Sequence, residues 1–217
     1  MSGKNKKSDI FNFLDEESSK RILLMDGAMG TMIQKYKFEE KDYRGQVLAK
    51  HDVDLKGNND VLNITNNEAI KDIHKKYLLA GSDILETNTF NGTSIAQSDY
   101  KLEAYVKEIN IKAVEAAQKA INECSIELGG KKILIAGALG PTNRTASISP
   151  DVEDPGKRNV TFDELTESYY EQAKYLLEAG VDIFLPETTF DTLNLKASIF
   201  ALKKLFTDSN LSLPVFL

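Results

Sequence analysis

The sequence predicts an α/β fold, and specifically an incomplete (β/α)8 TIM-type barrel with about six of its eight strands present. Short apolar runs of strand length alternate along the chain with longer amphipathic segments of helical period. The run 133–138 is apolar throughout, as expected for a parallel strand whose two faces are both covered. Two units, 80–90 and 179–190, end in the same order of acid, threonine and phenylalanine, which is typical of strands that deliver their carboxyl ends to one face.

The amino-terminal half is expected to alternate strands and helices. A helix at 31–36 follows a glycine-rich turn, and Thr65 and Glu68 have the spacing of a capping box that opens a second helix. The apolar positions of this second helix recur at helical intervals until Gly81. The strands of this half are predicted from short apolar runs, at 21–25, 61–64 and 83–87.

The carboxyl-terminal half continues the alternation. Thr161 and Glu164 again have capping-box spacing, and the helix that they open is expected to end at Gly180. Further helices are predicted at 103–122 and 192–205, and the strands at 133–138, 182–185 and, just beginning, 214–217. Because such barrels take about 250 residues, we expect the sequence to be truncated. An open doubly wound sheet stays an alternative, since alternation alone does not distinguish the two folds.

Composition narrows the possible functions. A net charge of −6 and the absence of basic clusters argue against nucleic acid or a membrane surface as partner. No apolar run reaches the about 20 residues of a membrane helix, and no secretory signal is present, so a cytoplasmic location is expected. We expect a polar amino-terminal extension at 1–20, with Lys4, Lys6 and Lys7 as a solvated basic tail, followed by the barrel domain at 21–217.

Asp26 is the first candidate functional residue. It ends the first predicted strand and is followed by Gly27 and Gly30. Parallel α/β sheets place their ligand sites beyond the carboxyl ends of the strands. The glycines would allow backbone N–H groups to approach a ligand closely. The alternative is a strand-to-helix turn in which these residues serve only the backbone.

Five segments together carry a resemblance to a known family. They resemble the amino-terminal homocysteine-binding domain of cobalamin-dependent methionine synthases, within the homocysteine S-methyltransferase family. The resemblance covers nearly everything from residue 21 onward, and its most specific parts are the long loops around Asn143 and Arg158. The segments are DGAMGT at 26–31, AGSDILETNTFNGT at 80–93, GALGPTNRTASIS at 137–149, PGKRNVTFDEL at 155–165 and ETTFDTLNLKA at 187–197.

The resemblance implies a methyltransferase reaction. In this family zinc, held by three cysteine thiolates, binds homocysteine as its thiolate, and the sulfur receives a methyl group to give methionine. The methyl group comes from methylcobalamin on another domain and derives from 5-methyltetrahydrofolate. The implied partners are therefore homocysteine and the cobalamin-binding and folate-binding domains of the same parent chain. A bound cation deprotonates a thiol that otherwise has a pKa of about 8.5, which explains the need for metal.

The resemblance also implies roles for individual residues. Asp26 and Gly27 match the motif that binds the amino-acid end of homocysteine, and Glu187 matches an acid that binds its ammonium group. Asn88 and Thr89 are expected to line the same pocket. Glu86 is expected to point outward, because side chains alternate along a strand.

Other residues of the sequence fit a catalytic role poorly. The zinc cysteines of the family are implied to lie beyond Leu217, and the single cysteine, Cys124, matches none of them and is expected to be structural. His51 and His74 are expected to be solvated and not to bind metal. Pro186 removes a strand donor before Glu187 and predicts a bulge or kink.

We therefore expect no catalytic residue, no bound zinc and no turnover in the sequence by itself. Two other classes of function stay open. The first is a corrinoid-independent homocysteine S-methyltransferase that uses a sulfonium or betaine-like donor, because such enzymes share the DGA motif and the zinc chemistry. The second is a non-catalytic binding module, which the missing cysteines would allow.

Overall fold

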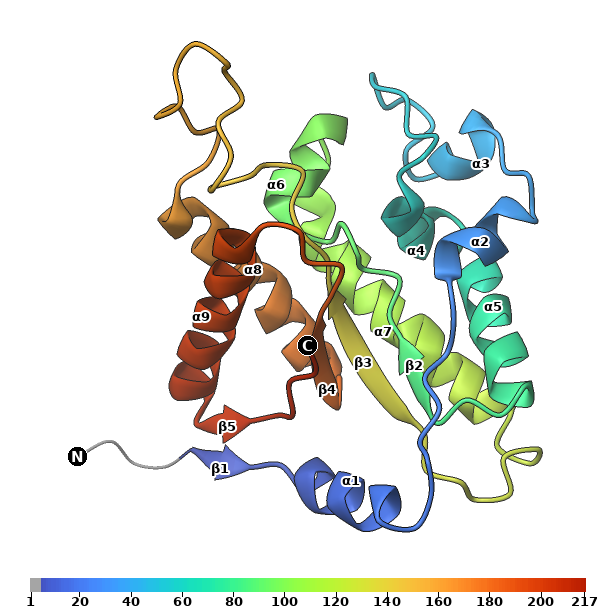
Figure 1. Ribbon diagram of the computed structural model, residues 1–217. Coiled ribbons are helices and arrows are strands. Elements are labelled where there is room, and N and C mark those ends of the chain that lie inside the picture. Colours follow the sequence, from blue (N-terminus) through green and yellow to red (C-terminus); the bar gives the residue numbers. More distant parts are fainter. Residues whose placement is uncertain (1–4) are drawn as a thin grey trace.

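A short, curved, parallel sheet forms the centre of the molecule in the computed structural model, which describes residues 5–217 (Figure 1). Its three strands are hydrogen-bonded in the order β2–β3–β4 and all pair in parallel. β3 is buried along its whole length, as its continuous apolar sequence predicts. The strands are β2 (Ile84–Glu86), β3 (Leu134–Leu139) and β4 (Ile183–Pro186).

Two further segments extend this sheet by single parallel bridges. Met25 pairs with Ile84 on one edge, and Val215 pairs with Phe184 on the other. Five adjacent segments therefore run parallel, which confirms the parallel α/β architecture but not the expected barrel with about six strands.

The helices surround the sheet and connect its strands (Figure 1). Helices α5, α7, α8 and α9 pack on its outer face, while α1 runs beneath the lower end in this view. Their bounds are α1 (Ile10–Ser18), α2 (Met29–Gln34), α3 (Glu40–Arg44), α4 (Leu62–Thr65), α5 (Asn67–Leu79), α6 (Ser94–Gln97), α7 (Val106–Glu123), α8 (Phe162–Ala179) and α9 (Thr192–Ser209). Short 3-10 turns occupy Asn59–Val61, Ser98–Tyr100 and Glu103–Tyr105, and a two-residue strand pair joins β1 (Lys6–Lys7) to β5 (Leu211–Ser212). Among residues 5–217 no helix is both long and apolar enough to cross a membrane.

Local sequence signals explain where the long helices begin and end. The capping box predicted for α8 is present, since the Thr161 side chain accepts from the N–H of Glu164 and the Glu164 carboxylate accepts from the N–H of Thr161. Gly180 ends this helix in the left-handed conformation, with φ of +96°. At the start of α9, the Asp191 carboxylate accepts from the backbone N–H groups of Leu193 and Asn194.

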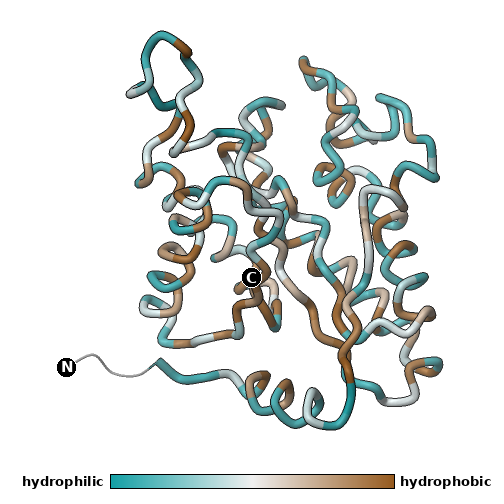
Figure 2. Tube along the Cα trace, viewed as in Figure 1, coloured by the Kyte–Doolittle hydropathy of each residue, from teal (hydrophilic) through white to brown (hydrophobic). Residues whose placement is uncertain are grey.

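Apolar residues are concentrated in the strands of the sheet (Figure 2), and buried apolar side chains pack on both of its faces. The outer face packs against α7, α8 and α9, with Leu85 and Phe184 among its buried residues. The inner face carries Ile84, Leu134 and Ile183, and Ile10 of α1 is buried against them. Helix α1 therefore contributes to the core by closing the lower end of the inner face.

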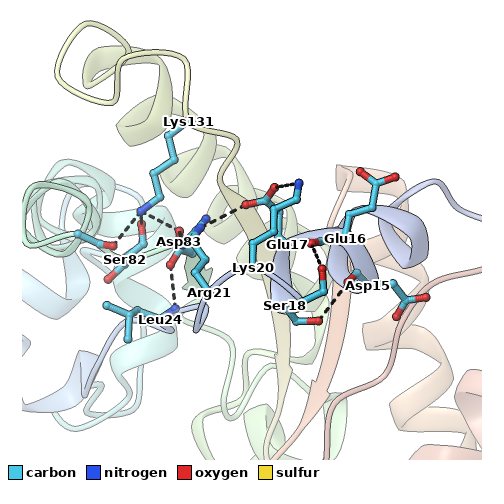
Figure 3. A network of polar contacts seen from close by, with 12 residues as sticks. Asp15, Glu16, Glu17, Ser18, Lys20, Arg21, Leu24, Ser82, Asp83 and Lys131 are labelled. Carbon is cyan, nitrogen blue, oxygen red and sulfur yellow. Dashed lines mark hydrogen bonds and ion pairs between the residues drawn. The ribbon is translucent and has the colours of Figure 1, made fainter.

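An ion cluster around the buried carboxylate of Asp83 fixes the first extended segment to β2 (Figure 3). The Asp83 carboxylate lies 2.8 Å from Arg21 Nη1 and 2.8 Å from Lys131 Nζ, and it accepts a 2.8 Å hydrogen bond from the N–H of Leu24. In the second copy of the repeated unit, Asp182 accepts in the same way from the N–H of Ile135 in the preceding strand. The aspartates of the repeat therefore tie neighbouring strands together at the end of the sheet opposite its carboxyl edge.

Several sequence predictions are wrong at the level of single elements. The run 61–64 is helical, because it completes a 3-10 turn and continues into α4. The predicted capping box at Thr65 and Glu68 does not form. Thr65 is the last residue of α4, where its hydroxyl donates to the carbonyl of Val61, and α5 begins after Asn66 without a side-chain cap.

The first predicted strand is only partly formed. Residues around Leu24 and Met25 pair with β2, but Ile22 is 83% exposed and Leu24 is 54% exposed. The bulge predicted at Pro186 is absent, since the register of β3 and β4 runs on to the pair Leu139 and Pro186.

The basic tail is only partly as predicted. Lys6 and Lys7 expose their side chains but pair through β1, whereas Lys4 lies outside the described residues.

Candidate functional site

A polar pocket with a volume of about 370 Å³ opens at the carboxyl ends of β2 and β4. Four acids contribute to its wall, together with the turn 27–30. Amide side chains, Thr87 and Phe90 complete the lining. The acids are Asp26, Asp60, Glu86 and Glu187, and the amides are Asn59, Asn88 and Asn91.

Strand alternation explains why two of these acids meet. Ile84 faces the inner core, so Glu86, two residues later, lies on the same face at the top of β2. Ile183 is likewise on the inner face, and Glu187 follows at the matching end of β4. Glu86 therefore points into the pocket and not outward, which corrects the sequence prediction for that residue.

Asp26 lies at the base of the pocket with its side chain only 1% exposed. Its Oδ1 accepts a 3.0 Å hydrogen bond from the N–H of Glu86, and its Oδ2 lies 3.9 Å from Nδ1 of His74. Burial raises the pKa of Asp26 to about 7, against the opposing effect of the Glu86 N–H. This carboxyl group can therefore gain or lose a proton near neutral pH.

Glu86 and Glu187 form an acidic pair in the same pocket. Burial raises the pKa of Glu86 well above its usual range, and the neighbouring Glu187 carboxyl adds to that effect. Glu187 Oε1 is buried without a hydrogen-bond partner, while Oε2 accepts a 3.3 Å bond from the hydroxyl of Thr188. A buried acceptor without a partner is suited to receive a donor from a ligand.

Asp60 was not identified from the sequence. It is buried, its Oδ1 accepts a 2.8 Å hydrogen bond from the N–H of Asn91, and burial raises its pKa to about 7. It lies in a 3-10 turn, directly before the run 61–64 that was expected to be a strand, and this position gave no signal of a site.

The predicted site residues only partly come together. Asp26, Gly27, Asn88 and Glu187 all line the pocket. The amide of Asn88 is also structural, since it donates to the carbonyl of Asn59 and to the side chain of Asn63.

Thr89 does not reach the pocket. It is fully buried, and its hydroxyl donates to the carbonyl of Ala138 at 2.9 Å and contacts the hydroxyl of Thr87 at 2.7 Å. Thr89 thus links the ends of β2 and β3, which is a structural position beside the pocket and not on its wall.

The two histidines have different environments. His51 is partly exposed, and its Nε2 lies 2.7 Å from the carbonyl oxygen of Tyr100. His74 is fully buried, so its prediction as a solvated residue is wrong. The charged neighbours Lys75 and Lys76 suggested an exposed helix face, but position 74 lies on the buried face of α5.

The described residues do not fit the zinc site that the family resemblance implies. Within 5–217, no group of three His, Cys, Asp or Glu side chains is arranged to hold a metal ion. Cys124, the only cysteine of the sequence, is buried at the end of α7 and packs in the outer core. The described residues therefore do not by themselves supply the ligands of such a zinc site.

The pocket has the chemistry of a site for a cationic group. Several carboxyl groups approach one another there, and like charges at short range favour protonation until a cation is present. A bound ammonium group would allow these acids to ionise, because its positive charge offsets their repulsion. It would donate a charge-assisted hydrogen bond to each carboxylate. The turn 27–30 adds backbone groups on the same wall.

Comparisons with known proteins agree with this fold. The family model described as homocysteine S-methyltransferase matches residues 23–217. Crystal structures of the homocysteine methyltransferase MmuM from Escherichia coli share the fold. The metallated form is 24% identical with a TM-score of 0.66 and covers 90% of this chain and 62% of that chain. The apo form is 20% identical with a TM-score of 0.60 and covers 94% and 63%.

The chain thus spans about three fifths of the length of the MmuM structures that it resembles. The match to the family model extends from the first extended segment to the last residue of the sequence and includes all four acids at the pocket together with the turn 27–30. This chain belongs to the homocysteine S-methyltransferase family.

Proposed function

We propose that this chain binds the amino-acid end of homocysteine as part of an enzyme that methylates the homocysteine sulfur to give methionine. The observation that carries the proposal is the convergence of Asp26, Glu86 and Glu187 on one pocket at the carboxyl edge of the sheet. Membership of the homocysteine S-methyltransferase family supports the choice of substrate.

Asp26 and Glu187 are the proposed partners of the substrate ammonium group. Asp26 is held by the N–H of Glu86 and is therefore oriented before the ligand arrives. Glu187 offers a buried oxygen without a partner. Each charge-assisted hydrogen bond to the ammonium group is worth about 1.5 to 3 kcal/mol.

Gly27 and the rest of the turn 27–30 are the proposed partners of the substrate carboxylate. This turn lies on the pocket wall beside Asp26, and its backbone N–H groups can approach an anion closely. Asn88 is proposed to line the same site, with its amide fixed by Asn59 and Asn63. The acids would then bind the ammonium group and the turn the carboxylate of the same amino acid.

The methyl donor is proposed from sequence resemblance. The loops 137–149 and 155–165 resemble those of cobalamin-dependent methionine synthases, so we propose methylcobalamin on another domain as donor and a zinc ion as the activator of the thiol. The three thiolates for that zinc are not among the residues of this sequence, so the residues described here contribute binding and not sulfur activation. A methyl-transfer assay on the parent enzyme with methylcobalamin and with a sulfonium donor tests this proposal, and activity with the sulfonium alone would contradict it.

Calorimetric titration of the 217-residue chain tests the binding proposal. L-homocysteine and L-homoserine, which share the amino-acid end, are expected to bind with similar affinity. N-acetyl-homocysteine, which keeps the thiol but lacks the ammonium group, is expected not to bind. Equal affinity for L-homocysteine and its N-acetyl derivative would contradict the assignment of the acids to the ammonium group.

A further inference from the structure

His74 is a buried imidazole for which the structure shows no hydrogen bond. It lies on α5 with 0% exposure, and neither Nδ1 nor Nε2 has a hydrogen-bond partner. A buried polar group without a partner costs about 1 to 3 kcal/mol, so such a group needs an explanation in the folded protein.

Asp26 is the group to which His74 is turned. Nδ1 of His74 lies 3.9 Å from Oδ2 of Asp26, which is about 1 Å longer than a hydrogen bond. The other oxygen of Asp26 is held by the N–H of Glu86. One carboxylate oxygen is therefore fixed by the backbone of β2, and the second faces the imidazole across a gap that a small side-chain rotation closes.

The protonation states of the two groups are complementary. Burial lowers the pKa of His74 to about 4, so the imidazole is neutral at neutral pH and has one nitrogen that donates and one that accepts. Burial also raises the pKa of Asp26 to about 7. The tautomer of a histidine is set by the partners of its nitrogens, and within residues 5–217 the carboxyl group that faces Nδ1 of His74, at 3.9 Å, is that of Asp26.

We propose that His74 is a positioning residue for Asp26, and that its tautomer follows the protonation of that carboxyl group. Nδ1–H donates to Asp26 when the acid is ionised, and Nδ1 accepts from Asp26 when the acid is protonated. On ionisation, Asp26 releases one proton to solvent. The imidazole stays neutral and exchanges its single proton between Nε2 and Nδ1 through solvent.

This arrangement keeps Asp26 in one orientation in both charge states. The inference rests on the proposed function in one respect, namely that a substrate ammonium group ionises Asp26 and thereby selects the Nδ1–H tautomer. The pairing of His74 with Asp26 itself needs no ligand.

The other titratable groups around the pair are few. Glu86 of β2 and Tyr77 of α5 both experience the charge of Asp26, and Glu187 lies beyond Glu86. Helices α2 and α4, which pack against α5, contain no titratable side chain. On α7, Glu123 is paired with Lys71 and Lys75 of α5. Asp26 is therefore the acid whose ionisation His74 should report most directly.

Long-range proton–nitrogen NMR of the ¹⁵N-labelled chain tests the proposal. The sequence has two histidines, so His51→Gln assigns the signals of His74. Between about pH 5 and about pH 9, His74 is expected to stay neutral and to change from the Nε2–H to the Nδ1–H tautomer, with a midpoint near pH 7. Asp26→Asn is expected to abolish the change, whereas Glu86→Gln, the matched control, is expected to retain it.

A single tautomer across this range, or a change that survives Asp26→Asn, would overturn the inference. The wild-type titration alone gives this answer if the Asp26 variant fails to fold. Saturating L-homocysteine is expected to move the midpoint to lower pH. If homocysteine does not shift the midpoint but the tautomer change still depends on Asp26, the proposed substrate is wrong and the role of His74 stands.

Discussion

The N–H of Glu86 donates a 3.0 Å hydrogen bond to Oδ1 of Asp26, and this bond joins two acids of the pocket through the backbone of one and the side chain of the other. The first extended segment and β2 are thus connected at the floor of the site. Because the Glu86 side chain lines the same pocket, the bond also fixes the spacing between the two carboxyl groups.

Replacing Asp26 or Glu187 by alanine is expected to weaken homocysteine binding. Each variant removes one charge-assisted hydrogen bond to the ammonium group, so the dissociation constant should rise by about 10-fold to 150-fold. Calorimetric titration measures the change. Glu167→Gln, which neutralises an exposed acid on α8, is the control and should leave the affinity unchanged. Unchanged affinity in both alanine variants would refute the assigned roles.

Homocysteine affinity is expected to increase as pH rises through about 7. Burial raises the pKa of Asp26 to about 7, and only the ionised carboxylate attracts the substrate ammonium group. Titrations over this range measure the slope, which Asp26→Asn should reduce. An affinity that does not change with pH would contradict the role of Asp26 as a titrating partner.

The raised pKa of Asp26 also makes stability depend on pH, but stability falls as pH rises whereas homocysteine affinity increases. Between the ordinary aspartate pKa and about 7, folded Asp26 holds a proton that the unfolded chain has lost. Its contribution to the free energy of unfolding is therefore complete at low pH and is lost as pH rises through 7, by up to about 1.4 kcal/mol per unit. Urea unfolding of wild type and Asp26→Asn separates this contribution from those of other groups.

Asp83→Asn is expected to destabilise the fold without a direct effect on the pocket. The variant removes the negative charge that lies between Arg21 and Lys131. Because both cations are partly exposed, the free energy of unfolding should fall by about 2 kcal/mol. Urea unfolding measures this loss, and Asp182→Asn is the matched control, because Asp182 accepts from a strand N–H but has no ion pair within 5–217. An equal loss in both variants would show that the cations contribute nothing.

The contribution of Asp83 should also depend on pH. Although burial opposes it, hydrogen bonds from Lys131, the Leu24 N–H and Arg21 lower the pKa of this carboxyl group below its ordinary value. The stabilisation is therefore present above the ordinary aspartate pKa and is lost as pH falls through the lower folded value. The difference between wild type and Asp83→Asn should shrink below about pH 4.

Gly140→Ala is expected to disturb the pocket from the loop after β3. A Cβ at this position would lie 2.4 Å from the carbonyl oxygen of Phe90 and 2.8 Å from its Cγ, and Phe90 lines the pocket. The forced shift should cost about 1 to 3 kcal/mol and weaken homocysteine binding. Gly156→Ala, whose nearest contact is a flexible aspartate side chain at 3.3 Å, should change neither the free energy of unfolding nor the homocysteine affinity. Wild-type stability in Gly140→Ala would contradict the predicted clash.

The sequence predicts the long elements of this fold well. The run that became β3 and the capped helix α8 carry unambiguous signals, since one is apolar throughout and the other has a capping box and a terminal glycine. The four-residue run 61–64 carries neither, and a short apolar run fits a buried helix as well as a strand. The first segment, 21–25, was predicted to be a strand because it is apolar, but hydrophobicity alone does not show whether a strand has a neighbour on both sides.

The site is harder to predict than the fold. Asp26 could be assigned to the pocket because it follows the end of a predicted strand, whereas Asn88 and Glu187 were assigned through the family resemblance. Glu86 was placed on the wrong face, although Ile84 and Glu86 share the inner face by simple alternation. Asp60 comes from a turn and His74 from a helix, so the place of Asp60 on the pocket wall and of His74 beside Asp26 depends on tertiary packing that no local pattern encodes.

The structure of the chain in complex with L-homocysteine tests the central claim most directly. Crystals grown near about pH 8, where Asp26 is ionised, are expected to show the ligand in the pocket. Its ammonium nitrogen should lie within about 3.2 Å of carboxylate oxygens of both Asp26 and Glu187. A ligand bound with its ammonium group away from these two acids, or an empty pocket at saturating ligand, would contradict the account.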